Sequence, residues 1–188
     1  MTEKTDLRSL EEGELAGLLA GLGQPAFRAG QVFSWLHQKR VASIGEMTNL
    51  SKELRAQLEE RCRVETLAIE RKQVSRLDGT VKYLFRLWDG NHVEAVLMQY
   101  RHGSSLCIST QVGCRMGCTF CASTLGGLVR NLSPGEMLSE VYEAQRDSGR
   151  RIDSIVLMGI GEPLDNFENV MKFLRLVSHP GGLNLGAR

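Results

Sequence analysis

The sequence contains neither the long apolar runs nor the charge imbalance that would assign a chain to a special class. No stretch approaches the roughly 18 consecutive apolar residues of a membrane-spanning helix, which excludes a transmembrane segment and a membrane partner. The first residues are polar and carry no apolar segment, so we expect no secretory signal peptide and a cytoplasmic location. Lysine plus arginine total 23 and aspartate plus glutamate total 22, so the net charge of +1 gives no global nucleic-acid signature.

The remaining composition is that of an ordinary globular protein, with 42% apolar and 24% charged residues in a chain of 188. This length is enough to bury a core. It is too short for a complete (β/α)₈ barrel, which typically needs about 250 residues. There is no internal repeat, but the apolar periodicity changes twice along the chain. We therefore predict an α/β protein in three parts: a helical accessory module over 1–65, a small antiparallel β-meander over 66–100, and alternating strands and helices over 101–188.

Helical signals dominate the first part. Ser9 and Glu12 have the spacing of a capping box, in which each side chain satisfies a backbone N–H of the other. An apolar stripe at helical spacing follows, made of Leu15, Leu18, Leu19 and Leu22. Ser51 has the position of an N-cap before a further helix.

The second part has an apolar residue at every second position over 81–87 and again over 93–97, which is typical of strands. Asp78-Gly79 precedes the first run, and Asp89-Gly90-Asn91 follows it. Because glycine and asparagine tolerate a positive φ, both sequences predict hairpin turns.

The third part predicts two consecutive βα units. A strand is expected over 105–110, followed by a helix that opens on a Ser133–Glu136 capping box with Pro134 at its first position. The apolar run 155–158 is typical of a buried parallel strand, and Asn166 is expected to cap the last helix. Two such units cannot close a barrel and would leave an unpaired strand edge, so we expect the sequence to be truncated after Arg188.

The cysteines carry the strongest chemical signal. Without an export signal thiols stay reduced, so three cysteines at C-x₃-C-x₂-C spacing, Cys114, Cys118 and Cys121, indicate metal or redox chemistry. Three thiolates in one loop can hold three irons of a [4Fe-4S] cluster and leave the fourth iron open to a small molecule. A structural zinc site is the alternative, and it would need a fourth ligand such as His102.

The motif resembles the signature of radical S-adenosylmethionine (SAM) enzymes, which have an aromatic residue before the last cysteine. The longer segments 107–124, 130–132 and 156–166, together with 78–83 and 92–97, resemble the RlmN/Cfr-type rRNA adenine-C2 methyltransferases, from about residue 20 to the end. The resemblance implies that the third part is the start of a partial (β/α)₆ radical SAM barrel. It also implies that Cys114, Cys118 and Cys121 bind a [4Fe-4S] cluster whose open iron binds SAM.

The same resemblance assigns roles to four further residues. Gly161 and Glu162 would contact SAM, and the residues themselves agree, because glycine permits a close backbone approach and glutamate offers an acceptor for an ammonium group. Glu94 would accept a proton at the end of methyl transfer; alone, it would be interpreted as a solvated glutamate on an edge strand. Cys107 would resolve a protein–RNA adduct through a disulfide with a second cysteine, whereas Cys62 has no assigned role.

The family's methyl-carrying cysteine lies in a C-terminal segment that this chain lacks, so we expect the chain alone to be inactive. The resemblance implies 23S rRNA and tRNA as substrates, an electron donor such as flavodoxin, and a monomer. A modest basic bias in the sequence agrees weakly with RNA binding; it consists of Arg55, Arg61, Arg63, Arg71, Lys72 and Arg76. Two alternatives stay open: methylation of adenine C8 on the same scaffold, and a non-catalytic RNA-binding fragment.

Overall fold

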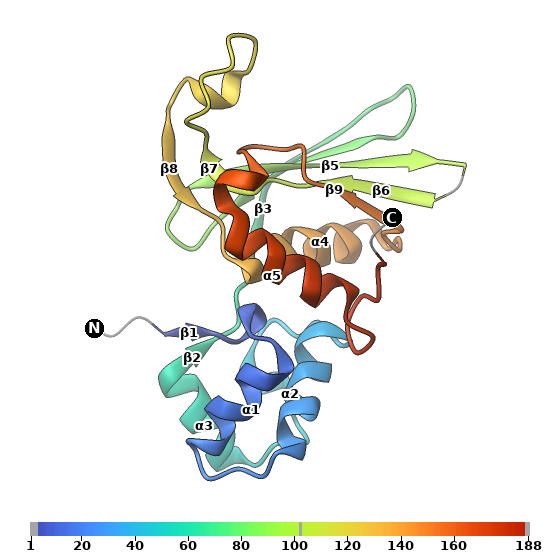
Figure 1. Ribbon diagram of the computed structural model, residues 1–188. Coiled ribbons are helices and arrows are strands. Elements are labelled where there is room, and N and C mark those ends of the chain that lie inside the picture. Colours follow the sequence, from blue (N-terminus) through green and yellow to red (C-terminus); the bar gives the residue numbers. More distant parts are fainter. Residues whose placement is uncertain (1–3, 102, 187–188) are drawn as a thin grey trace. The chain divides into compact units, whose positions relative to one another are not determined.

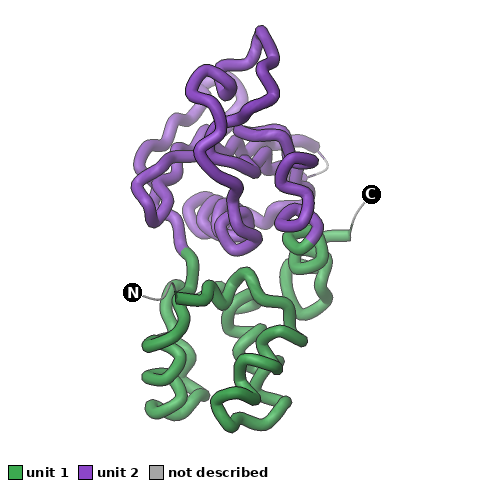
Figure 2. The backbone as a smooth tube through the Cα atoms, turned by 60° about the vertical axis from the view of Figure 1, so that its left-hand side comes forward, with its two compact units in different colours: residues 1–65, 172–188 green, residues 66–171 purple. Residues whose placement is uncertain are grey.

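The computed structural model describes residues 4–101 and 103–186. The chain forms two compact units, one made of residues 1–65 with 172–188 and the other of residues 66–171 (Figure 2). Helices and sheets occur together, which confirms the expected α/β class. Within the described residues, no helix is long and apolar enough to cross a membrane.

The first unit is built from short helices (Figure 1). They are the 3₁₀ helix η1 (Leu7–Ser9), α1 (Glu12–Ala20), α2 (Phe27–His37), the 3₁₀ helix η2 (Ile44–Glu46) and α3 (Lys52–Arg61). The two-residue strands β1 (Thr5–Asp6) and β2 (Cys62–Arg63) pair in parallel. Leu15 and Leu19 of the predicted stripe are buried, whereas Leu18 and Leu22 are half-buried.

The helix caps observed in this unit agree only in part with those predicted from the sequence. The Leu54 N–H donates to the Ser51 hydroxyl at 3.2 Å, which confirms Ser51 as the N-cap of α3. The predicted Ser9–Glu12 box is wrong: α1 instead begins after Glu11, whose N–H donates to the Glu14 carboxylate at 2.8 Å. The reason is that Ser9 belongs to η1, where its hydroxyl donates to Asp6 at 2.5 Å.

A five-stranded sheet, in the order β3-β4-β5-β6-β9, organises the second unit. Strands β3 (Ala68–Val74), β4 (Val81–Arg86), β5 (His92–Tyr100) and β6 (Gly103–Cys107) are antiparallel neighbours, and β9 (Ser154–Val156) runs parallel to β6. Gly79 and Gly90 adopt φ values of 72° and 83° in the two turns, which confirms both predicted hairpins. The strands expected over 105–110 and 155–158 are observed over 103–107 and 154–156.

Helix α4 (Pro134–Ser148) is buried over most of its length and begins at the predicted cap. The Glu136 N–H donates to the Ser133 hydroxyl at 3.2 Å, and the Ser133 N–H donates back to the Glu136 carboxylate at 2.9 Å. The Tyr83 hydroxyl of β4 donates to Asp147 of α4 at 2.8 Å, which ties the sheet to the helix.

The connection after β9 ends in the 3₁₀ helix η4 (Pro163–Asn166) and continues as α5 (Phe167–Ser178). Asn166 is not the cap we expected, because it is the last residue of η4 and is buried. Its amide donates to the carbonyl oxygens of Thr110 and Leu132, both at 2.8 Å. The residue therefore ties η4 to the segments on either side of a small hairpin.

That hairpin consists of β7 (Gln111–Gly113) and β8 (Leu128–Asn131), and the loop between them contains the 3₁₀ helix η3 (Ala122–Thr124). Figure 1 shows this loop at the far end of the hairpin, beyond the five-stranded sheet. The three cysteines at C-x₃-C-x₂-C spacing all lie in this loop.

Candidate functional site

The cysteine loop, residues 114–127, is closed by its own backbone. The Cys114 N–H donates to the carbonyl oxygen of Gly127 at 3.1 Å, and the Cys121 N–H donates to that of Cys118 at 3.1 Å. Gly113 has φ 74°, and a Cβ atom there would lie 1.9 Å from the Gly127 carbonyl oxygen. Only glycine fits at this point, so the chain can turn sharply just before the first cysteine.

The structure places the three sulfurs in one loop but with unequal exposure: Cys114 is buried, Cys121 half-buried and Cys118 exposed. Among residues 4–101 and 103–186, no three His, Cys, Asp or Glu side chains are gathered closely enough to bind a metal. His102 lies outside the described residues. The fit to an iron–sulfur cluster rests on the donors themselves, three free thiols beside a turn that glycine makes possible. All five cysteines are free thiols, so the anticipated disulfide of Cys107 is absent.

The segment Gly159–Glu162 follows β9 and is attached to the segment 108–111, which follows β6. The Gly159 N–H donates to the Ile108 carbonyl oxygen at 2.9 Å, and the Thr110 N–H donates to that of Ile160 at 2.9 Å. A Cβ atom on Gly159 would lie 2.6 Å from the Ile108 carbonyl oxygen. The missing Cβ atom therefore lets the two segments of this chain approach each other closely.

Glu162 is half-buried at the start of η4, where its carboxylate accepts the Leu164 N–H at 3.2 Å. Gly161 adopts φ 103°, and a Cβ atom there would lie 2.6 Å from the Gln111 Cβ. Both residues follow the carboxyl end of β9, and the β7–β8 hairpin that carries the cysteine loop follows the carboxyl end of β6, its parallel neighbour. In α/β folds, this end of parallel strands is where ligands bind.

Gln111 of β7 links the hairpin to the segment Gly159–Glu162. Its side-chain oxygen accepts the Glu162 N–H at 2.9 Å, and its side-chain nitrogen donates to Asn131 at 2.8 Å and to Asp165 at 2.9 Å. Arg115, inside the cysteine loop, donates from Nε to the Asp165 carboxylate at 3.2 Å. Hydrogen bonds from Arg115 and then from Gln111 lower the pKa of Asp165.

Glu94 and Cys107 lie on the same face of the five-stranded sheet. Cys107 of β6 is directly opposite Val96 of β5, so Glu94 is its diagonal neighbour. The Glu94 carboxylate pairs with Lys82 of β4 at 2.8 Å and is 40% exposed, so its surroundings on this face are partly charged and open to solvent. Burial raises the pKa of the half-buried Cys107 thiol, against a hydrogen bond from the Met158 backbone that lowers it.

Two ionisable residues near the hairpin had no role in the sequence analysis. Arg130 of β8 forms ion pairs with Asp89 at 2.7 Å and Glu136 at 2.8 Å, and it anchors the hairpin to a turn of the sheet and to α4. Glu140 of α4 is fully buried, which raises its pKa, and it accepts the Ser109 N–H at 3.1 Å. A glutamate between apolar residues on the inward face of a helix is the signal that could have identified it.

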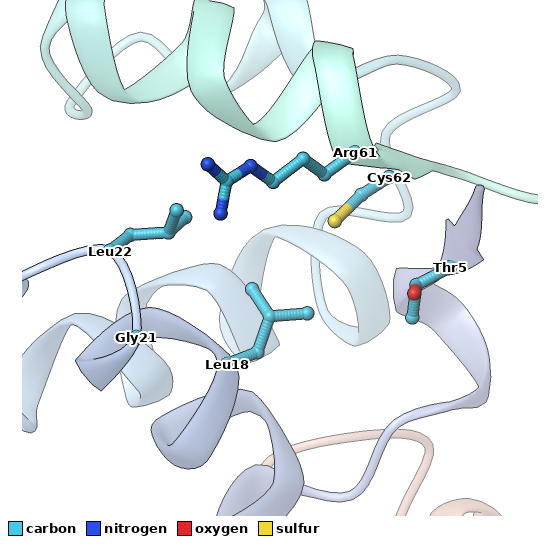
Figure 3. Close-up of a pocket in the computed structure, with 6 residues that line it drawn as sticks. All are labelled: Thr5, Leu18, Gly21, Leu22, Arg61 and Cys62. Atoms are coloured by element: carbon cyan, nitrogen blue, oxygen red, sulfur yellow. The ribbon is translucent and has the colours of Figure 1, made fainter. Parts of the chain in front are cut away.

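Cys62 lies in the other compact unit, where it lines a pocket of about 190 Å³. Figure 3 shows its thiol with the side chains of Leu18, Leu22 and Arg61 around this pocket. Burial raises the pKa of the Cys62 thiol. The residue takes no part in the cysteine loop.

Comparison with known proteins defines the class first. Residues 108–187 match the family model of the radical SAM superfamily, whose members use SAM and an iron–sulfur cluster. Residues 5–64 match the ribosomal RNA large subunit methyltransferase N-terminal domain. The crystal structure of a radical SAM methyltransferase from Sphaerobacter thermophilus has a TM-score of 0.87 and 41% identity to this chain; the match covers 98% of this chain and 55% of that one.

Similar curated proteins then give the more specific likeness. A probable dual-specificity RNA methyltransferase RlmN from Lachnoclostridium phytofermentans is 56% identical over 188 residues, which is 100% of this chain and 53% of that protein. The protein of that name from Bacillus thuringiensis subsp. konkukian is 52% identical over 190 residues, again 100% of this chain and 52% of that protein. The chain is thus similar over its whole length to RlmN proteins, contains a segment that matches the radical SAM superfamily, and spans about half the length of these relatives.

Proposed function

We propose that the protein containing this chain is a radical SAM methyltransferase that adds a methyl group to C2 of adenine in 23S rRNA and in tRNA. One observation carries the proposal: the hairpin with the C-x₃-C-x₂-C loop follows the carboxyl end of β6, the segment Gly159–Glu162 follows that of its parallel neighbour β9, and Gln111 of the hairpin accepts the Glu162 N–H. Relatives named RNA methyltransferases match the whole chain and support RNA as the substrate.

In this proposal, Cys114, Cys118 and Cys121 hold a [4Fe-4S] cluster, and Gly161 and Glu162 contact SAM. The bound cluster and SAM supply the radical chemistry, and the chain positions and shields them. The β7–β8 hairpin presents the three thiols, and its anchor at Arg130 fixes it to α4 and to the sheet. The electron donor is a reductant such as flavodoxin. The enzyme acts as a cytoplasmic monomer.

Glu94 accepts a proton at the end of methyl transfer, and Cys107 acts as the resolving thiol. Their support is the register of the sheet, which places the two side chains on one face as diagonal neighbours. A proton acceptor and a thiol on one face of one sheet can serve the same substrate. Lys82 pairs with the Glu94 carboxylate and holds it on this face.

Iron loading of the complete natural protein tests the cofactor. Anaerobic reconstitution should give about four iron atoms per chain, and replacement of Cys114, Cys118 or Cys121 by alanine should abolish loading. Cys62→Ala is the matched control, because Cys62 is outside the loop, and it should load like the wild type. Stoichiometric zinc in place of iron would contradict the proposal.

Product mapping tests the reaction. The iron-loaded protein should convert adenine to 2-methyladenine in 23S rRNA and tRNA, as measured by mass spectrometry of RNA nucleosides. Glu94→Gln keeps the size of the side chain but removes the proton acceptor, so it should lower product formation without loss of iron. Methylation at C8 would replace the proposed regiochemistry. RNA binding without turnover in the iron-loaded protein would favour the non-catalytic alternative.

A further inference from the structure

Gln111 is buried, and its side-chain oxygen, side-chain nitrogen and backbone N–H all form hydrogen bonds, to three segments. Its side-chain oxygen accepts from Glu162 at 2.9 Å, its nitrogen donates to Asn131 of β8 and to Asp165 of η4, and its backbone N–H donates to Ile160 at 3.2 Å. The left-handed φ of Gly161, together with the missing Cβ, makes room for the Gln111 side chain. A residue satisfied in this way fixes the positions of the segments that it contacts.

Asp165 extends this connection into the cysteine loop. Its carboxylate is only 10% exposed and accepts from Gln111 and from Arg115, which lies between the first two loop cysteines. A carboxylate with two donors on different segments holds them together more firmly than either hydrogen bond alone, since hydrogen bonds to charged groups are the stronger ones. Arg115 itself is 63% exposed, so it can be replaced without disturbing a core.

We propose that Gln111, Asp165 and Arg115 form a positioning bridge that sets the cysteine loop relative to the segment Gly159–Glu162. Resting on the proposed function, this assigns the three residues a role in SAM binding: they align the segment that contacts SAM with the loop that holds the cluster. The bridge contributes no ligand to the metal. Its loss therefore weakens SAM binding while the three thiols still load iron.

The test uses three variants of the complete natural protein. Gln111→Glu replaces the amide donor by an acceptor that faces Asp165 and Asn131, and Arg115→Ala removes the donor from the loop. Arg115→Lys restores a cation that can reach Asp165. Gln73→Glu is the matched control, because it makes the same change in charge on the exposed strand β3 of the same unit.

Three readouts separate positioning from folding. Iron content should equal that of the wild type in all four variants. The dissociation constant of SAM, measured by titration of the electron paramagnetic resonance signal of the reduced protein, should rise about tenfold in Gln111→Glu and Arg115→Ala, since a buried donor or acceptor loses its partner. Arg115→Lys should recover most of the affinity. Hydrogen–deuterium exchange should become faster in residues 114–127 of iron-free Gln111→Glu and Arg115→Ala, but not in Gln73→Glu.

The outcomes are distinct for the two proposals. If the wild type loads iron and binds SAM but Gln111→Glu and Arg115→Ala match it in SAM affinity and exchange, the bridge is wrong and the proposed function stands. If the wild type takes up no iron, the proposed function fails. Hydrogen–deuterium exchange in residues 114–127 of Gln111→Glu and Arg115→Ala then decides whether the positioning bridge exists. Faster exchange there supports it and unchanged exchange overturns it. Loss of iron from Arg115→Ala also overturns it, because the residue would then be needed to form the metal site.

Discussion

At the scale of single residues, the reactivity of Cys107 follows from its position in β6. Burial raises the pKa of its thiol, so less of the reactive thiolate is present at neutral pH than in an exposed cysteine. We predict that iodoacetamide modifies Cys107 more slowly than the exposed Cys118 in the iron-free protein at pH 7.5, and that the rate at Cys107 keeps rising above pH 9. Peptide mass spectrometry measures both rates in one sample. Equal rates at neutral pH would contradict the assigned burial.

The spacing of residues in the sequence predicts which side chains can act together in one loop better than it predicts which distant segments contact them. The C-x₃-C-x₂-C spacing identified one loop with three free thiols, because such ligands are close in the sequence. Glycines at 159 and 161 correctly indicated a close approach, but the approaching atoms are those of Ile108 and Gln111, and local sequence does not reveal them. The ion pair of Glu94 with Lys82 depends in the same way on strand register.

At the scale of elements, the β4–β5 turn and the β7–β8 hairpin are joined by the Asp89–Arg130 ion pair. The Arg130 hydrogen bond lowers the pKa of Asp89 from 3.8 to about 2. Because the folded-state pKa is the lower one, this stabilisation is present above pH 3.8 and disappears as the pH falls through about 2. We predict that Asp89→Asn lowers the free energy of unfolding by about 1–2 kcal/mol at pH 7.

Denaturant unfolding of both proteins between pH 7 and pH 2 measures this difference, which should shrink below pH 4 and vanish near pH 2. Asp78→Asn is the matched control in the other hairpin turn, where the uncharged donors Ser75 and Thr80 lower the pKa of the aspartate. It should be less destabilising than Asp89→Asn. A difference that persists at the lowest pH would show that Asp89 acts through its shape rather than its charge.

Elements with strong local signals were predicted well. The Ser133 capping box and both hairpin turns are present, because each depends on residues within a few positions of one another. The start of α1 was wrong, because Asp6 engages Ser9 and the Glu11–Glu14 pair takes over the cap. Asn166 was also misassigned, because its partners Thr110 and Leu132 are far away in the sequence.

At the scale of the whole molecule, the changes in periodicity predict the α/β class. They do not predict which residues belong to each compact unit. Residues 172–188 share a unit with 1–65. Lys172 pairs with Glu14 at 2.7 Å, and the rings of Phe33 and His179 lie 4.5 Å apart. Contacts over such separations leave no trace in local periodicity, so only the structure reveals them.

The composition of the chain also predicts what it cannot do alone. In the proposed reaction, a cysteine outside the cluster and distinct from Cys107 must carry the methyl group. Of the five cysteines, three lie in the loop, Cys107 is in β6, and Cys62 is in the unit that does not contain the loop. We predict that the iron-loaded 188-residue chain gives no methylated adenine, whereas the complete natural protein does under the same conditions. Mass spectrometry of nucleosides from treated 23S rRNA measures both, and 2-methyladenine from the 188-residue chain would mean that Cys62 or another group accepts the methyl.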